Sequence, residues 1–220
     1  MTTLATKKIV VLISGNGSNL QAIVDNIHHT KIAEKNVEIA AVISDEANCY
    51  GLERAKNAGI PTQVVAKTAD LSRDEYSELL DNAITAFQPD LILMAGFMRI
   101  VSTNFVEQNM GKILNIHPSL LPKYRGINTH QSAIDAGDKE HGATVHFVTA
   151  ELDSGPIILQ AKVPVFAEDK AQDLAERVLT QEHSIYPLAA KWLLSGRLTM
   201  ANNQALLDGH VLPENGYAAD

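Results

Sequence analysis

Cysteine is almost absent from this sequence. Cys49 is the only one in 220 residues, so no disulfide can form within the chain. A basic surplus is absent too, since 26 acidic residues outnumber 18 basic ones and give a formal net charge of −8. Non-specific nucleic-acid binding relies on a cationic surface and is therefore not expected. No apolar run is long enough to span a membrane, and the run at residues 9–13 is too short for a secretory signal. We expect a cytoplasmic protein with neither a membrane nor a nucleic-acid partner.

The length and an apolar content of 45% are ordinary for one globular domain, which we expect over residues 1–220. The run at residues 9–13 is typical of a strand buried on both faces, and strand and helix patterns alternate after it. This alternation predicts an α/β fold with an open, mostly parallel twisted sheet of about seven strands and helices on both faces. The expected strands are 9–13, 37–43, 62–66, 91–95, 112–117, 144–148 and 157–165. The expected helices start near Leu20 and cover 51–58, 72–87, 104–109, 129–136 and 169–194, the last bent or broken near Pro187.

Two local features refine this prediction. Ser72 and Glu75 have capping-box spacing at the start of one helix, and Asp208-Gly209 favours a hairpin in the tail after residue 200. In open α/β sheets, ligands bind beyond the carboxyl ends of the strands. The loops that follow the strands are therefore where functional residues are expected.

The first such loop, residues 14–20, reads Ser-Gly-Asn-Gly-Ser-Asn-Leu. Its glycines allow a sharp turn and a close approach of backbone to ligand, and free N–H groups at the following helix start favour an anion such as a phosphate monoester. Leu20 stands where a dinucleotide fingerprint needs its third glycine, and the lysine of a P-loop is missing. The alternative is a tight turn with a helix cap.

Asn115 and His117 lie two residues apart in an expected strand that Pro118 ends, so their side chains share one side. An amide can donate to a developing oxyanion and an imidazole can carry protons, which together suit acyl chemistry. A hydrogen-bonded polar pair at a strand end is the alternative. Asp153 lies in a turn-rich loop, where its carboxylate pairs with a histidine or forms a local turn.

A metal site is not expected, because no histidine or cysteine spacing matches a metal-ligand motif. His28 and His29 are interpreted as a solvated helix end. His141, His146 and His210 are interpreted as packing or surface residues.

Four stretches taken together are more specific: residues 13–21, 94–100, 114–122 and 141–156. They resemble the folate-dependent formyltransferase family over residues 8–219. The His-Pro-Ser-Leu-Leu-Pro stretch at 117–122 is shared across that family, and the loop at 14–20 points to a phosphoribosyl substrate. The resemblance implies formyl transfer from 10-formyltetrahydrofolate, a co-substrate, to the amine of glycinamide ribonucleotide in purine synthesis. It also implies a phosphate-binding half at 8–110, a folate and catalytic half at 111–200, a tail at 201–220, and a monomer or weak homodimer.

Site residues follow by match to the family's motifs. Asn115, His117 and Asp153 match the catalytic trio, and Gly17, Ser18, Asn19 and Glu182 match positions that bind the ribonucleotide. The positions that match the folate pocket are Arg73, Met98, Arg99, Ile100, Val101, Asn115, Thr149, Ala150, Glu151, Leu152 and Asp153. The sequence departs from some relatives at Arg125, where they have proline, and at Asn128, where they have histidine. An auxiliary histidine at position 128 is therefore missing, although His130 lies nearby.

Two other activities stay open at this point. A formyl-folate hydrolase or a formyltransferase acting on aminoacyl-tRNA would share the chemistry, but both normally carry an additional domain, for which 220 residues leave no room. A non-catalytic phosphate sensor would keep the glycine loop without needing Asn115, His117 and Asp153 together.

Overall fold

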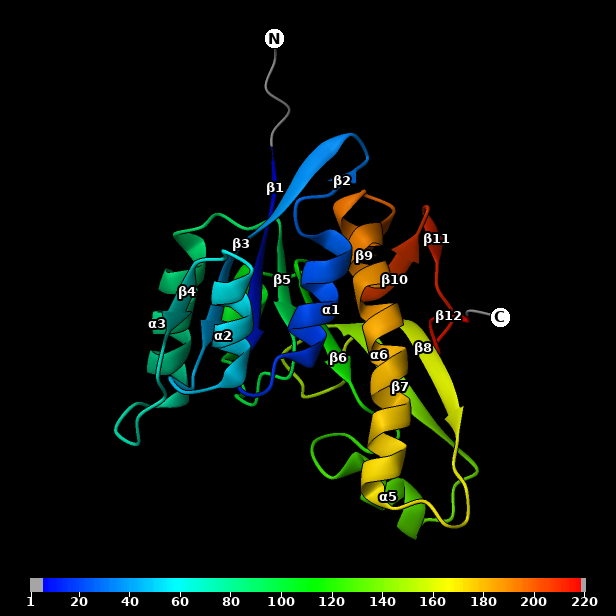
Figure 1. Cartoon of the computed structure of the whole chain (residues 1–220). Coiled ribbons are helices and arrows are strands. Elements are labelled where there is room, and N and C mark those ends of the chain that lie inside the picture. Colours follow the sequence, from blue (N-terminus) through cyan, green and yellow to red (C-terminus); the bar gives the residue numbers. More distant parts are fainter. Residues whose placement is uncertain (1–5, 219–220) are drawn as a thin grey trace.

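The computed structural model describes residues 6–218 as an α/β fold around one mixed sheet (Figure 1). The sheet has the strand order β12-β8-β7-β6-β5-β1-β3-β2, with β4 also paired to β3. Seven of its strands have three or more residues: β1 (Lys7–Ile13), β3 (Lys35–Ser44), β4 (Thr62–Val64), β5 (Leu91–Met94), β6 (Ile113–His117), β7 (Glu140–Phe147) and β8 (Ile157–Pro164). The predicted fold class and strand number are confirmed. Two short strands, β2 (Lys31–Ile32) and β12 (Tyr217–Ala218), were not predicted.

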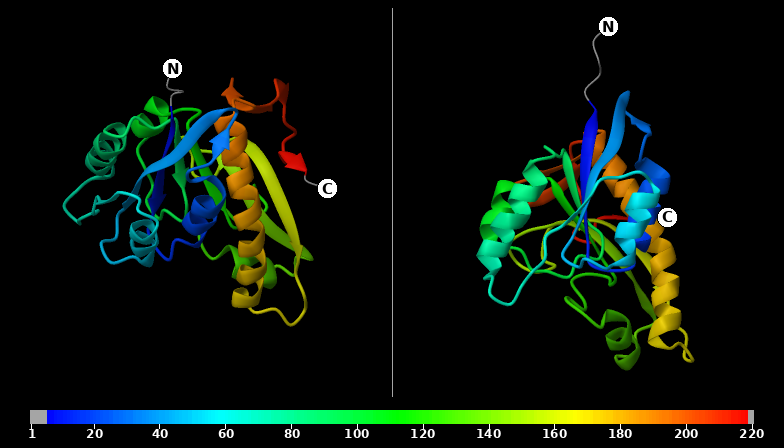
Figure 2. Two further views of the ribbon diagram at one scale, coloured as in Figure 1. Left: turned by 45° about the horizontal axis from the view of Figure 1, so that its top comes forward. Right: turned by 60° about the vertical axis from the view of Figure 1, so that its left-hand side comes forward.

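Helices cover both faces of the sheet, as predicted (Figure 2). One face packs against α1 (Ser18–Ile27), α2 (Tyr50–Asn57) and α6 (Ala171–Leu194), and the other against α3 (Arg73–Thr85) and α4 (Thr103–Gln108). Strand β1 shows why: Val11 belongs to the first core, Leu12 to the second, and both are fully buried. Successive side chains of a strand point to opposite faces of the sheet, so a continuous apolar run packs against the helices on both faces.

The sheet changes direction in its second half. Strands β4, β3, β1, β5 and β6 run parallel to one another, whereas β7 runs antiparallel to both β6 and β8. Asn115 of β6 is therefore directly opposite His146 of β7. The expected strand at 144–148 begins earlier than predicted, at Glu140.

Two helix predictions have different outcomes. At the start of α3, Ser72 accepts from the Glu75 backbone N–H while Glu75 accepts from the Ser72 N–H, which confirms the capping box. Of the bend or break predicted near Pro187, the break is wrong, because α6 continues through Pro187 to Leu194. Proline removes one helical hydrogen bond, but the neighbouring side chains of Tyr186 and Ala189 are fully buried against the sheet and hold the helix there.

The tail forms a separate three-stranded sheet from β9 (Leu198–Ala201), β10 (Gln204–Leu207) and β11 (His210–Val211). The hairpin predicted around Asp208-Gly209 is confirmed; a second turn at Asn202-Asn203, where both residues have positive φ, was not predicted. No helix within residues 6–218 is long and apolar enough to cross a membrane. The single domain expected over 1–220 includes residues 1–5 and 219–220, which lie outside the described residues.

Candidate active site

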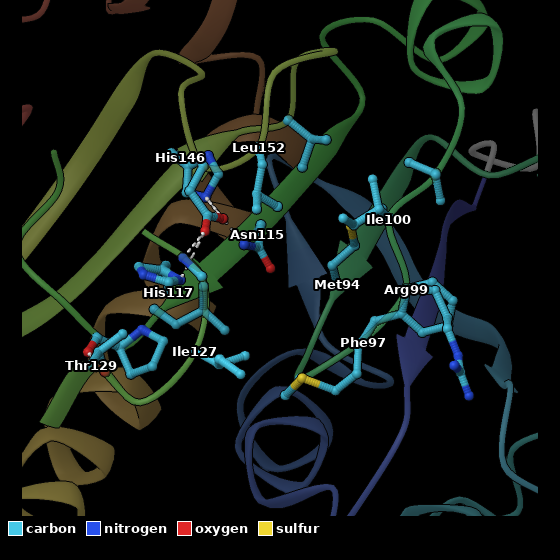
Figure 3. Close-up of a pocket in the computed structure, with 18 of the residues that line it drawn as sticks. Met94, Phe97, Arg99, Ile100, Asn115, His117, Ile127, Thr129, His146 and Leu152 are labelled. Carbon is cyan, nitrogen blue, oxygen red and sulfur yellow. Dashed lines mark hydrogen bonds and ion pairs between the residues drawn. The ribbon is translucent and has the colours of Figure 1, made fainter. Parts of the chain in front are cut away.

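A cavity of about 540 Å³ opens beyond the carboxyl ends of β5 and β6 (Figure 3). This volume suits a small organic ligand. The cavity is lined by the end of β6, by the segments 96–101, 126–129 and 148–153, and by Asn19 and Glu182 from α1 and α6. The parallel strands end here, where ligands of open α/β sheets bind. The structure thus brings Asn115, His117 and Asp153 into one cavity, together with Asn19 and Glu182.

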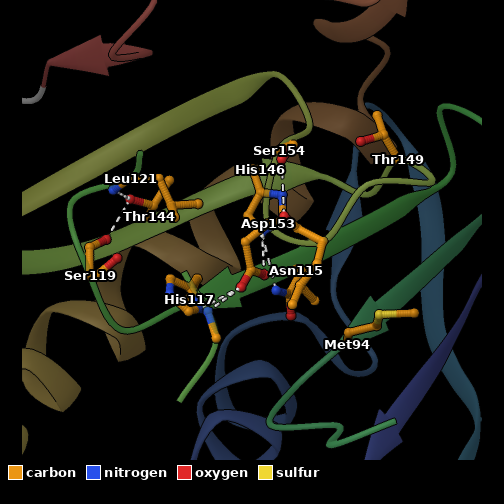
Figure 4. Close-up of polar contacts among 12 residues, drawn as sticks. Met94, Asn115, His117, Ser119, Leu121, Thr144, His146, Thr149, Asp153 and Ser154 are labelled. Carbon is orange, nitrogen blue, oxygen red and sulfur yellow. Dashed lines mark hydrogen bonds and ion pairs between the residues drawn. The ribbon is translucent and has the colours of Figure 1, made fainter. Parts of the chain in front are cut away.

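His117 lines this cavity, and Figure 4 shows its side chain next to the Asp153 carboxylate. Its Nδ1 is 3.5 Å from Asp153 Oδ2, and both side chains are more than nine-tenths buried. Its Nε2 is 2.8 Å from the Tyr124 carbonyl oxygen, to which it donates because a carbonyl can only accept. The Gly126 backbone N–H donates to Asp153 Oδ2 at 2.9 Å. The backbone of segment 124–126 therefore holds both the His117 ring and the Asp153 carboxylate in place.

Asn115 is oriented by His146, which the sequence interpretation placed among packing or surface histidines. Nδ1 of His146 donates to the Phe147 carbonyl at 2.8 Å, so the other nitrogen, Nε2, accepts from Asn115 Nδ2 at 3.1 Å. Burial lowers the pKa of His146 to about 4, which keeps the ring neutral and able to accept. His146 also lies 3.8 Å from Asp153 Oδ1. The sequence alone does not predict this role of His146, because it depends on the antiparallel pairing of β6 and β7 that places His146 opposite Asn115.

The glycine loop turns sharply against α2. Gly17 has a positive φ of 75°, and a Cβ atom there would lie 2.6 Å from the Gly51 Cα, so a side chain does not fit. The Arg54 guanidinium donates to the Asn16 carbonyl oxygen at 2.9 Å and to the Asn16 side chain at 3.1 Å. Helix α1 begins directly afterwards at Ser18, with no side-chain cap. The N–H groups at its start are therefore available to an anion.

Glu182 joins this loop to the cavity. Asn19 Nδ2 donates to Glu182 Oε2 at 2.6 Å, and both residues are more than nine-tenths buried. Burial raises the pKa of the Glu182 carboxyl, while the Asn19 hydrogen bond opposes that shift. The Asn19 Oδ1 atom is buried with no partner. A polar ligand between the loop and the cavity would satisfy it.

Most of the residues expected to bind folate line the cavity, but Arg73 does not, and the guanidinium of Arg99 is bound elsewhere. Met98 to Val101 and Thr149 to Asp153 line the cavity, and its rim is apolar: Met98, Ile100, Leu152 and also Ile127 expose half or more of their surface. Arg99 lines the cavity as well, but its guanidinium donates to Asp45 and Glu46. Arg73 lies outside the cavity at the start of α3, with 58% of its side chain exposed. Gly17 and Ser18 also lie outside the lining, in the glycine loop.

His130 in α5 (Thr129–Asp135) and His141 in β7 lie outside the cavity lining. His130 and His141 share a hydrogen bond of 3.2 Å, and Asn128, at a positive φ of 60°, lines the cavity next to Thr129. Burial lowers the pKa of both histidines, that of His141 to about 4. Within residues 6–218, no group of three or more histidine, cysteine or acidic side chains is arranged to hold a metal ion.

The sequence and the fold match the formyl transferase family. A model of the formyl transferase family matches residues 7–190, and the chain belongs to that family of enzymes. Phosphoribosylglycinamide formyltransferase of Escherichia coli (strain K12) is 56% identical over 96% of this chain and 99% of its own length. The human trifunctional purine biosynthetic protein adenosine-3 is 43% identical over 89% of this chain and 19% of its own length. The solved phosphoribosylglycinamide formyltransferase of Coxiella burnetii has a TM-score of 0.89 at 45% identity and covers 97% of this chain and 99% of that one. The resemblance expected from four motifs is confirmed.

Proposed function

We propose that this enzyme transfers the formyl group of 10-formyltetrahydrofolate to the amine of glycinamide ribonucleotide in purine biosynthesis. The observation that carries the proposal is the buried juxtaposition of His117 with Asp153, beside Asn115, between a glycine loop and an apolar rim. One end of the cavity then takes a phosphorylated amine, and the other takes the rings of a folate. The name phosphoribosylglycinamide formyltransferase, carried by two relatives that the chain covers almost entirely, supports the same formyl acceptor.

The amine attacks the formyl carbon directly and generates a tetrahedral oxyanion, which needs hydrogen-bond donors in fixed positions. Asn115 has two N–H bonds; one is directed to His146, and the other is free for the oxyanion. His117 has acceptor oxygens beside both ring nitrogens, an arrangement that suits the imidazolium. It adds positive charge next to the oxyanion. Because both ring nitrogens have partners, the proton moves from the amine to the leaving nitrogen through water, or through His117 once its contact with the Tyr124 carbonyl opens.

The remaining residues bind the two substrates. Gly17, Ser18 and Asn19 hold the phosphate at the start of α1, and Glu182 holds the polar part of the ribonucleotide. Met98 to Val101 and Thr149 to Asp153 surround the folate, and Arg73 binds it from the start of α3, outside the cavity lining. No metal takes part in this scheme. The chain works as one domain with a phosphate-binding half at 8–110, a folate and catalytic half at 111–200 and a tail at 201–220, as a monomer or weak homodimer in the cytoplasm.

The substrate assignment is tested by removing the phosphate. Initial rates are measured with glycinamide ribonucleotide and with the corresponding ribonucleoside, at saturating 10-formyltetrahydrofolate. We expect the ribonucleoside to have a KM at least roughly 100-fold higher, since it loses several charge-assisted hydrogen bonds. Equal KM values would contradict the role of residues 17–19.

A further inference from the structure

Asp45 connects three strand ends that surround the site but lies outside the cavity itself. It directly follows β3, whereas Ser14 follows β1 and Met98 follows β5; β1 lies between the other two in the sheet. The Ser14 hydroxyl donates to Asp45 Oδ1 at 2.6 Å and accepts from the Met98 backbone N–H at 2.8 Å. Asp45 Oδ2 accepts from Arg99 Nε. One carboxylate thus holds Met98 through a serine and Arg99 directly.

The two acidic partners of Arg99 differ in burial. The Asp45 side chain is 1% exposed, whereas Glu46, whose Oε1 lies 3.0 Å from the same guanidinium, is 54% exposed. A buried, hydrogen-bonded charge pair fixes geometry far more strongly than a pair in solvent. Figure 3 shows the consequence: the Arg99 side chain points away from Asn115 and His117. Arg99 therefore presents mainly its backbone and carbon stem to the cavity.

Apart from Phe97, which packs against the core on the α3 side of the sheet, the segment that carries Met98 and Arg99 has few other anchors. Residues 97–100 form neither helix nor strand, and Met98 and Ile100 are exposed. At its start, Ser14 N–H donates to the Gly96 carbonyl at 3.1 Å. The glycine loop, in contrast, has anchors of its own, from Gly51 N–H to the Gly15 carbonyl and from Arg54 to Asn16. Loss of Asp45 would therefore loosen the 97–100 segment more than the glycine loop.

We propose that Asp45 is a positioning residue for the folate side of the cavity, which sets the place of residues 97–100 through Ser14 and Arg99 without touching either substrate. This inference rests on the proposed function, since the ligand of that segment is the formyl-folate donor. Asp45 determines the affinity for the donor and leaves the chemistry at His117 to other groups.

The experiment compares Asp45→Asn, Arg99→Gln and the double variant with a matched control, Glu46→Gln, which removes the exposed partner of the same guanidinium. KM for each substrate and kcat are measured alongside thermal unfolding. We expect Asp45→Asn to raise KM for the donor about tenfold, as misplaced binding groups do, and to change KM for the ribonucleotide less than about twofold. The double variant should resemble Asp45→Asn, because Arg99 acts through its contact with Asp45.

Several results would overturn the inference. These are an unchanged donor KM in Asp45→Asn, an equal rise in both KM values, effects that multiply in the double variant, or an equal effect of Glu46→Gln. Should Asp45→Asn fail to fold, Ser14→Ala removes the link to Met98 alone, and it too must raise the donor KM selectively. Wild-type turnover is recorded first: its absence would contradict the proposed function, whereas normal wild-type turnover with an unshifted variant contradicts only the role of Asp45.

Discussion

Asn115 Nδ2 donates to His146 Nε2 at 3.1 Å across the antiparallel pair β6–β7, and this contact fixes which way the carboxamide faces. The histidine is 2% exposed and its other nitrogen donates to the Phe147 carbonyl, so its tautomer is determined by the backbone. A neutral, fully buried imidazole thus orients a group proposed to donate to the oxyanion.

We therefore predict that His146→Leu lowers kcat by about 10- to 100-fold, because an unoriented amide is a poorer oxyanion donor. The KM for the ribonucleotide should change little, since its binding loop lies elsewhere. Steady-state kinetics on a variant with a cooperative unfolding transition measures both values. A folded variant with wild-type kcat would show that Asn115 needs no such partner.

Removal of either side chain proposed to stabilise the oxyanion should lower kcat more severely. We predict that Asn115→Ala and His117→Ala stay folded and lose on the order of 10²- to 10³-fold in kcat. His210→Ala, a substitution of an exposed histidine, serves as the control and should leave turnover unchanged. Near-normal turnover in either active-site variant is the contrary result.

The stability of the fold should fall at acidic pH because His141 is buried beside His130. His141 titrates near 6.5 when unfolded but has a pKa of about 4 in the fold, so the unfolded state takes up the proton first. Stability is therefore intact above pH 6.5 and is lost as the pH falls from 6.5 to 4, by on the order of 3 kcal/mol from this residue. Unfolding midpoints between pH 8 and 4 test this. The loss should be smaller in His141→Gln than in His210→Gln, and identical pH profiles would contradict the assignment.

Glu182 is expected to lower the stability of the unliganded protein at neutral pH and to contribute to binding of the ribonucleotide. Its carboxyl has a raised pKa in the fold, so it stabilises the protein below its unfolded pKa and loses that contribution as the pH rises. Glu182→Gln is therefore expected to raise the unfolding temperature at neutral pH without ligand. The same change should raise KM for the ribonucleotide about tenfold or more, as expected when a charged hydrogen-bonding group is lost. A variant that is both less stable and fully active would refute this reasoning.

Local sequence signals predicted the elements that depend on local physics. The apolar run of β1 and the capping box at Ser72 are local, and both are confirmed. The shared side of Asn115 and His117 follows from strand geometry, and both residues line one cavity.

Which strands lie side by side in the sheet, and in which direction, could not be predicted from the sequence. The role of His146 depends on β7 lying antiparallel to β6, and the place of Asp45 depends on β3 lying beside β1. The continuity of α6 through Pro187 was missed for a related reason, since buried neighbours contributed from distant strands hold the helix. Arg99 was expected at the folate, and only its tertiary contacts with Asp45 and Glu46 reveal where its guanidinium points.

The most direct test of the central claim is the dependence of formyl loss on the amine. Purified protein is given 10-formyltetrahydrofolate with and without glycinamide ribonucleotide, and the deformylated folate and the formylated amine are both quantified. Direct transfer predicts that the two products appear in equal amounts and only when the amine is present. Formyl loss without the amine would instead identify a hydrolase, and no turnover under either condition would contradict formyl transfer at Asn115, His117 and Asp153.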